Sequence, residues 1–213
     1  MKLYLSSYRL GNNPEELLRL LGGKKRAAVI INARDFLEPE ARAEDLAQEL
    51  ERLQVLDLDF TEVDLRKYFG KTEELKAELE SYDLIWVRGG NVFLLRRAFR
   101  QSGADTFFAG MLRAKDIVYG GYSAGICILQ PHLYGIELVD DPNQLGDGYD
   151  AEIIWDCLGV LPYVVAPHYK SDHPESADID KTVAYYIDSH IPFVALRDGQ
   201  AIVIDGLSQT FVG

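Results

Sequence analysis

Two kinds of apolar pattern alternate along the first part of the chain. Short, continuously apolar runs, such as residues 27–31, are typical of strands buried on both faces of a parallel sheet. Longer segments space their apolar residues three or four positions apart, as in Leu46, Leu50 and Leu53, which is typical of a helix. The predicted strands are residues 2–6, 27–31, 56–63, 83–87 and 117–122. The predicted helices are residues 14–22, 38–53, 71–81, 92–100 and 107–113.

This alternation of strands and helices predicts an α/β fold with a mostly parallel sheet and helices on both faces. After the short helix that follows the strand at 117–122 the pattern changes, because residues 131–150 are rich in Pro, Gly, Asp and Asn. We expect a long loop there, which would cover the candidate site described below and favour short substrates. The remaining elements are a strand at 160–166, a helix at 171–189, a β-hairpin formed by 193–196 and 201–204, and an edge strand at 210–212. No linker or repeat interrupts the order, so residues 1–213 are expected to form one domain.

The turn Gly121-Tyr122-Ser123-Ala124-Gly125 lies between a predicted strand and a helix. Gly-x-Ser-x-Gly in this context is typical of a nucleophilic serine that stands exposed on a sharp turn. The glycines leave room for strand and helix to approach closely, and the helix N-terminus favours developing negative charge. An ordinary strand-to-helix turn is the alternative, because glycine and serine are common in turns.

A nucleophilic serine needs a base, and the base needs a carboxylate that orients it. His168 follows a predicted buried strand, at the end of the sheet where Ser123 is expected, so it is the favoured base. For the carboxylate the loop after the serine helix offers several candidates. Glu137 is the first choice because apolar neighbours would hold its backbone firmly, and Asp140 is the second. A zinc site built from His168 and His173 is disfavoured because no third ligand has metal-site spacing, so no metal is expected.

A glycine pair, Gly89-Gly90, followed by Asn91, ends the strand before the serine strand. The N–H of Gly90 could face an oxyanion together with the N–H of Ala124, the residue after the serine. A tight turn capped by Asn91 explains the same residues equally well. Candidate substrate-binding residues around this turn and the two predicted catalytic residues are Gly89, Asn91, Tyr122 and Lys170.

Composition narrows the class of protein further. The formal net charge of −12 argues against general nucleic-acid binding and against binding to anionic membranes. No apolar run approaches the roughly 20 residues of a membrane span, and the first residues turn polar too early for a signal peptide. Two cysteines imply no disulfide framework, so a cytoplasmic location is expected. The sequence leaves open whether the protein is a monomer or a homodimer.

Four segments in order resemble the peptidase E (dipeptidase E) family of serine peptidases, to which cyanophycinase is related. They are residues 87–93, the serine turn at 121–125, residues 139–143 and residues 166–169. The resemblance implies a class I glutamine amidotransferase-like (flavodoxin-like) fold with a C-terminal β-hairpin. It also implies Ser123 as nucleophile, His168 as base, and the backbone groups of Gly90 and Ala124 as oxyanion hole.

The chain departs from that family at two points. Alignment on Asp141-Pro142-Asn143 places the family's acidic residue beside Ile136, so that Glu137 requires a shift of one residue. The Asp-specific dipeptidases have an arginine downstream of the histidine, whereas residues 170–181 contain none. Lys170 could supply a positive charge there, but it is not equivalent to arginine.

Together these observations predict a serine hydrolase that cleaves small peptides without a cofactor. An amidase or amidotransferase-like enzyme with a non-peptide substrate would use the same serine and oxyanion hole. A non-catalytic binding domain of the same fold is a third possibility. An α/β-hydrolase is disfavoured because only 45 residues separate Ser123 from His168, which leaves little room for that fold's additional elements.

Overall fold

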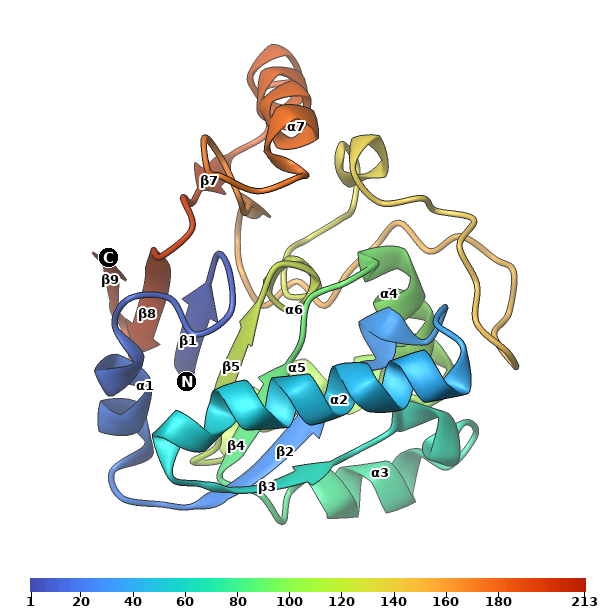
Figure 1. Ribbon diagram of the computed structural model, residues 1–213, viewed down its shortest axis with the longest axis vertical. Coiled ribbons are helices and arrows are strands. Elements are labelled where there is room, and N and C mark those ends of the chain that lie inside the picture. Colours follow the sequence, from blue (N-terminus) through green and yellow to red (C-terminus); the bar gives the residue numbers. More distant parts are fainter.

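A seven-stranded sheet forms the centre of the computed structural model, which describes residues 1–213 (Figure 1). The strand order is β3-β2-β4-β5-β1-β8-β9. The first five strands are parallel to one another, whereas β8 pairs antiparallel with β1, and β9 pairs antiparallel with β8. Its strands are β1 (Lys2–Ser6), β2 (Arg26–Ile30), β3 (Asp59–Glu62), β4 (Leu84–Val87), β5 (Val118–Tyr122), β8 (Ala201–Asp205) and β9 (Ser208–Val212). The mostly parallel α/β architecture predicted from the sequence is therefore confirmed.

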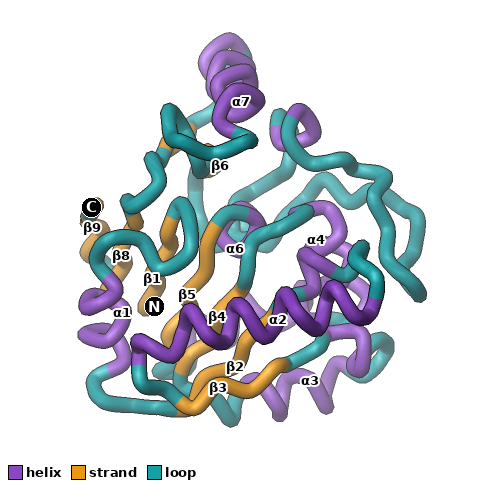
Figure 2. Tube along the Cα trace, viewed as in Figure 1, coloured by secondary structure: helices purple, strands orange, loops and turns teal.

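Helices cover both faces of this sheet (Figures 1 and 2). They are α1 (Pro14–Leu21), α2 (Pro39–Leu53), α3 (Thr72–Leu79), α4 (Val92–Gln101), α5 (Ala104–Ala114) and the short α6 (Ala124–Cys127). Apolar side chains of α1 and α2 pack on one face, and those of α3, α4 and α5 pack on the other. Alternate residues of each strand point to opposite faces, so Ala28 and Ile30 join one core while Ala27 and Val29 join the other.

A smaller two-stranded parallel sheet stands above the main sheet (Figure 2). It consists of β6 (Val164–Ala166) and β7 (Phe193–Ala195), which are connected by helix α7 (Ser176–Asp188). Val164 and Ala166 pack against α7 in a third apolar cluster, whereas Val165 faces the core of the main sheet. The small sheet is thus held between α7 and the rest of the molecule.

The C-terminal hairpin is present, but its strands differ from those predicted. Strand β8 pairs with β1 and with β9, whereas β7 pairs in parallel with β6. The hairpin therefore consists of β8 and β9, and the expected pairing of residues 193–196 with 201–204 is wrong. No helix combines the length and apolar character needed to cross a bilayer.

Candidate active site

Ser123 stands at the junction of β5 and α6 in a strained backbone conformation, with φ 52° and ψ −120°. Non-glycine residues adopt positive φ only when the surrounding structure enforces it, and such residues cluster at functional sites. The flanking glycines create the space for this turn. A Cβ atom would lie 2.6 Å from the Val87 carbonyl oxygen at Gly121, and 2.1 Å from the same oxygen at Gly125. Both glycines are therefore needed for β4 to pass directly beside the serine turn.

The glycine pair after β4 lies against the same serine. A Cβ atom at Gly89 would be 2.8 Å from the Cβ atom of Ser123, so the two backbones are in close contact. Gly90 has φ 146°, a conformation that favours glycine, and a Cβ atom there would be 2.5 Å from the Ala33 carbonyl oxygen. The Gly90 N–H donates to no acceptor of the chain. Ala124 is the first residue of α6, so its N–H belongs to the helix N-terminus beside the serine.

His168 lines the same cavity as Ser123, and its Nδ1 atom is 2.7 Å from Oδ1 of Asp198. The parallel register of the small sheet explains this contact, because Ala166 is paired with Ala195. The histidine and the aspartate therefore follow neighbouring strand ends. Burial of the imidazole, which is 1% exposed, lowers the pKa of His168, while the Asp198 carboxylate acts in the opposite direction. The imidazole is consequently neutral at neutral pH, as a general base must be.

Ser7, at the end of β1, connects both partners of this pair. Its hydroxyl accepts a hydrogen bond from the His168 backbone N–H at 2.8 Å and donates to Oδ1 of Asp198 at 2.9 Å. The Ser171 hydroxyl in turn accepts a hydrogen bond from the Asp198 backbone N–H at 2.8 Å. Sequence reasoning missed Asp198, Ser7 and Ser171. The only signal for Ser7 and Asp198 was their position after strand ends, and Asp198-Gly199 is also an ordinary turn sequence.

Neither carboxylate proposed from the sequence contacts the imidazole. Glu137 lies in a short 3₁₀ helix (Ile136–Leu138), where its carboxylate accepts a hydrogen bond from the Gly135 backbone N–H at 2.6 Å. The Asp140 carboxylate accepts from the Val92 N–H at 2.7 Å, at the start of α4, and burial raises the pKa of Asp140 to about 7. Asp198, and neither Glu137 nor Asp140, is therefore the carboxylate in contact with the His168 imidazole.

Comparison with known proteins places this chain in a family. The family model of peptidase family S51 matches residues 12–212. The chain belongs to peptidase family S51. It is 28% identical over 138 residues to the uncharacterized peptidase Lin0382 of Listeria innocua and 25% identical over 138 residues to peptidase E of Streptomyces coelicolor. These alignments cover 61% of this chain, and 63% and 52% of the respective relatives. The matched part is thus less than two thirds of either relative.

Solved structures show the same fold over nearly the whole chain. A crystal structure from Listeria monocytogenes EGD-e, described as a candidate peptidase E, superimposes with a TM-score of 0.78 and 22% identity. It covers 99% of this chain and 97% of that one. A peptidase from an acI-B1 Actinobacterium superimposes with a TM-score of 0.67 and 18% identity, over 100% of this chain and 87% of that one. The expected resemblance to the peptidase E family is confirmed.

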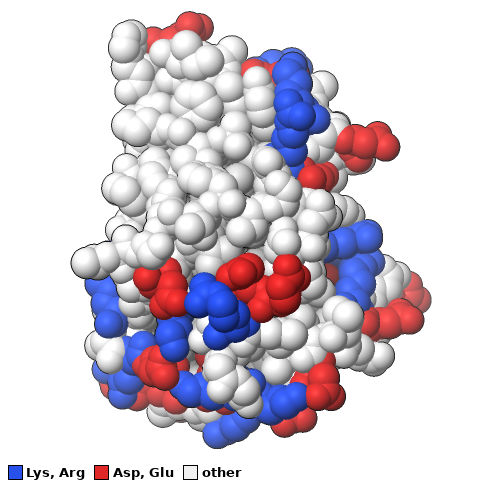
Figure 3. Space-filling model, turned by 90° about the vertical axis from the view of Figure 1, so that its left-hand side faces the viewer, with Lys and Arg blue, Asp and Glu red and all other residues white.

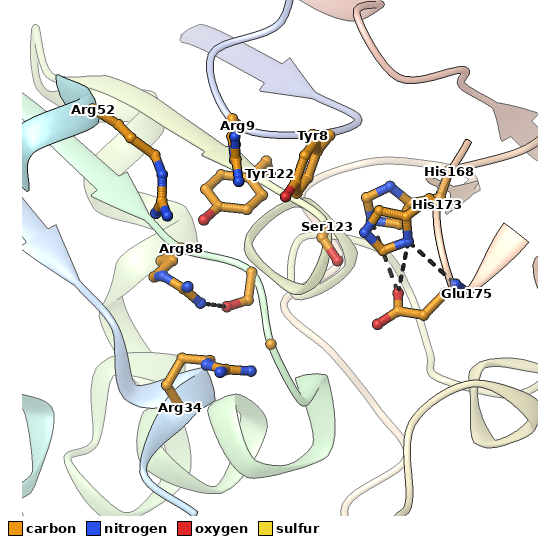
Figure 4. Close-up of a pocket in the computed structure, with 12 residues that line it drawn as sticks. Tyr8, Arg9, Arg34, Arg52, Arg88, Tyr122, Ser123, His168, His173 and Glu175 are labelled. Atoms are coloured by element: carbon orange, nitrogen blue, oxygen red, sulfur yellow. Dashed lines mark hydrogen bonds and ion pairs between the residues drawn. The ribbon is translucent and has the colours of Figure 1, made fainter. Parts of the chain in front are cut away.

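The S51 site of this chain opens into a cavity of about 180 Å³ whose two sides carry opposite charge (Figure 4). On one side of Ser123 lie His168, His173 and Glu175. The other side is a wall of four guanidinium groups, which we call the arginine wall: Arg9, Arg34, Arg52 and Arg88. On the molecular face seen in Figure 3, by contrast, acidic and basic side chains are interspersed.

Two buried carboxylates lie behind the arginine wall and neutralise only part of its charge. Asp45 accepts from Arg88 at 2.6 Å and lies 3.4 Å from Arg34, while Glu49 lies 3.3 Å from Arg52. Arg9 takes part in no ion pair, and its guanidinium lies over the Tyr8 ring, 4.6 Å from the ring centroid. Four positive groups against two negative ones leave this side of the cavity with excess positive charge.

The residues expected to bind substrate divide into two groups. Gly89 and Tyr122 line the cavity, where the Tyr122 hydroxyl donates to Glu49 at 3.0 Å. Asn91 and Lys170 do not line it. The Asn91 side chain caps α4 by accepting from the Leu94 N–H at 3.0 Å, and Lys170 is half-exposed and paired with Asp180.

The loop at residues 131–150 also departs from expectation, because none of its residues lines the cavity shared by Ser123 and His168. Its contacts tie it to α4 instead. Asn91 donates to the Asp141 carbonyl oxygen at 2.9 Å, and Arg97 donates to the Pro142 carbonyl oxygen at 2.8 Å. On its other side Ser123 lines a second, smaller cavity together with Ile136, Val139 and Asp140, so the loop approaches the serine from there.

Proposed function

We propose that this protein is a serine peptidase that hydrolyses short peptides with Ser123, His168 and Asp198 as its catalytic triad. The observation that carries the proposal is the buried contact of 2.7 Å between His168 and Asp198 beside a serine on a strained strand-to-helix turn. Membership in peptidase family S51 supports the reaction class. The arrangement needs no metal or cofactor for acyl transfer.

In this mechanism the Ser123 hydroxyl attacks the carbonyl carbon of the scissile amide, and Nε2 of His168 takes the hydroxyl proton. Asp198 accepts the hydrogen bond from Nδ1–H, which fixes the tautomer that leaves Nε2 free and stabilises the imidazolium once it forms. The imidazolium then donates its proton to the leaving amine. Water attacks the acyl-enzyme by the same route in reverse and releases the acid.

The oxyanion of the tetrahedral intermediate would be bound by the N–H groups of Gly90 and Ala124. The Gly90 N–H is uncommitted, and the adjacent Gly89 lies against the serine, so the donor is close to the reacting carbon. The second donor belongs to the N-terminus of α6, where the helix favours negative charge. Preorganised donors of this kind supply much of the catalysis in acyl transfer.

The arginine wall supports a proposal for the substrate class. A cavity of about 180 Å³ holds only a few residues, and excess positive charge on one side favours a substrate with a carboxylate near the scissile bond. A short peptide satisfies this condition through its C-terminal carboxylate or an acidic side chain. We therefore propose dipeptides and tripeptides that carry such a group as the substrates.

Labelling with a fluorophosphonate probe tests the nucleophile directly. We expect one adduct per chain in the wild-type protein, on the peptide that contains Ser123, and none in Ser123→Ala. A library of dipeptides and tripeptides, followed by mass spectrometry, then identifies the substrates. Labelling of a different residue, or turnover that persists in Ser123→Ala, would overturn the proposal.

The arginine wall is tested with Arg9→Gln and the matched variant Lys170→Gln. Arg9 lines the cavity without a carboxylate partner, whereas Lys170 is paired with Asp180 outside it. Removal of one partly exposed charge contact costs about 1 kcal/mol, so Arg9→Gln should raise KM about fivefold for a peptide with a free carboxylate. Lys170→Gln should leave KM unchanged. Equal effects of the two substitutions would contradict recognition by the arginine wall.

A further inference from the structure

Three potential metal ligands meet at the edge of the cavity opposite the arginine wall. His168, His173 and Glu175 come from one short segment of the chain, and their donor atoms all lie within 4.8 Å of one another. Oε2 of Glu175 is 3.9 Å from Nε2 of His168 and 4.0 Å from Nδ1 of His173 (Figure 4). Glu175 thus faces both imidazoles. The sequence alone did not reveal this third ligand.

The hydrogen bonds around the two rings leave the facing nitrogen atoms able to bind a metal. Asp198 accepts from Nδ1–H of His168, so the lone pair of this imidazole is on Nε2. A histidine whose other nitrogen donates to a carboxylate is the usual form of a metal ligand, because the carboxylate orients the ring and raises its basicity. Nδ1 of His173 accepts only a long hydrogen bond of 3.3 Å from the Glu175 backbone N–H. Each of the two nitrogen atoms near the Glu175 carboxylate therefore carries a lone pair, and that of His173 must leave the Glu175 backbone N–H to bind an ion.

We propose that His168, His173 and Glu175 form a binding site for a divalent transition-metal ion, with Zn²⁺ as the preferred ion, and that the bound ion inhibits the enzyme. Two imidazoles and one carboxylate are a donor set that suits zinc, whereas Mg²⁺ and Ca²⁺ prefer oxygen ligands alone. Three protein ligands leave a fourth coordination position for water or, because Ser123 lines the same cavity, for the serine oxygen.

Binding requires a small rearrangement that the segment can make. Donor atoms around a tetrahedral zinc ion lie roughly 3.3–3.6 Å apart, so each of the two measured distances must close by roughly half an ångström. The two imidazoles are stacked face to face, with ring centroids 3.7 Å apart and an interplanar angle of 7°. One ring must therefore turn for both lone pairs to meet an ion. His173 is the ring that can turn, because its side chain is 15% exposed while that of His168 is 1% exposed.

The bound ion would inhibit because it occupies Nε2 of His168. That lone pair must take the proton of Ser123 in the proposed mechanism, and a metal bond removes it from the reaction. Inhibition thus rests on the proposed function, whereas metal binding does not. Because the ring stack must break, the affinity should be weaker than that of structural zinc sites.

Calorimetric titration of the full chain with Zn²⁺ tests binding without any assay of activity. We expect one ion per chain for the wild type, and an affinity at least about tenfold lower for Glu175→Gln and for His173→Asn. His190→Asn is the matched control, because His190 is an exposed histidine outside the cavity, and its affinity should equal that of the wild type. Circular dichroism establishes that each variant is folded. Failure of wild type to bind, or equal affinity in all four proteins, would overturn the proposal.

Fluorophosphonate labelling of Ser123 tests inhibition. Zn²⁺ should suppress labelling of the wild-type protein at the concentration that fills the site, and a chelator should restore it. Glu175→Gln should require at least about ten times more Zn²⁺ for the same suppression. Labelling that continues on the zinc-saturated wild type would contradict coordination through His168. If no protein is labelled under any condition while zinc binds at this site, the proposed peptidase function fails and the metal site stands.

Discussion

The His168 imidazole is positioned by side chains that follow different strands. Asp198 follows β7 and contacts Nδ1, while Ser7 follows β1 and holds both the His168 backbone N–H and the Asp198 carboxylate. His168 itself has φ 61°, a conformation that the surrounding contacts must enforce. These hydrogen bonds hold Asp198 and His168 in their positions relative to each other. Charge alone therefore does not decide which carboxylate meets the imidazole.

Substitution of each carboxylate in turn distinguishes Asp198 from Glu137 as the residue that orients His168. Asp198→Asn keeps the size of the side chain but favours the wrong histidine tautomer, so kcat/KM should fall by about 10⁴. Glu137→Gln is the matched control, because its carboxylate only accepts a local backbone hydrogen bond, and kcat/KM should stay near that of the wild type. Steady-state kinetics on one peptide compares them. A large loss in Glu137→Gln with a small loss in Asp198→Asn would restore the acid expected from the sequence.

The pH dependence of kcat/KM reports the protonation of His168. The base must be neutral, so activity rises with pH through the pKa of this histidine in the free enzyme. Burial lowers that pKa below its ordinary value of about 6.5, so the midpoint of the acid limb should lie below pH 6.5. Rates measured from pH 4 to 8 with a substrate whose own groups do not titrate near the midpoint give this value. A midpoint above pH 6.5 would show that Asp198 outweighs burial.

At the scale of elements, the serine turn depends on close contact between β4 and α6. Gly125→Ala would place a Cβ atom 2.1 Å from the Val87 carbonyl oxygen, so the strand and the helix would have to separate. We expect a loss of about 3 kcal/mol in the free energy of unfolding, a Tm about 6–12 °C lower, and loss of activity.

The matched control for this substitution is Gly110→Ala. Gly110 is exposed in helix α5, and no atom lies within 4 Å of the position that an alanine methyl group would take, so alanine should stabilise the helix by about 0.5–1 kcal/mol. Differential scanning calorimetry and an activity assay distinguish the two variants. A Gly125→Ala protein that keeps the wild-type Tm would contradict the tight contact.

The elements that the sequence predicted well are those whose signal is local. Short apolar patterns indicated the five parallel strands, and Gly-x-Ser-x-Gly indicated the turn at Ser123, because both signals depend on near neighbours. The pairing of β6 with β7 depends on residues about thirty positions apart, and each strand has only three residues. The Asp198-Gly199 turn signal suggested a hairpin instead, and the acid was expected only in the loop after the serine helix.

At the scale of the whole molecule, the candidate active site is assembled from two packing units. Ser123 and the glycine pair belong to the seven-stranded sheet, whereas His168 and Asp198 follow the strands of the small sheet. The small sheet and α7 share a cluster of five buried residues, compared with 36 and 15 in the two cores of the main sheet. A smaller apolar cluster supplies less stabilisation, so this part of the molecule should open more readily than the main sheet.

Two identical substitutions in different cores test this difference. Val183→Ala removes two methyl groups from the cluster under α7, and Val29→Ala removes the same groups from the core that α1 and α2 cover. Each should cost about 2 kcal/mol locally. Val183→Ala should accelerate amide hydrogen exchange selectively in residues 164–198. It should also lower activity, because His168 and Asp198 lose their fixed positions.

Val29→Ala should lower the Tm but leave activity unchanged at temperatures well below the Tm, because the small sheet that carries His168 and Asp198 is untouched. Uniform acceleration of exchange in Val183→Ala would show that both packing units unfold together.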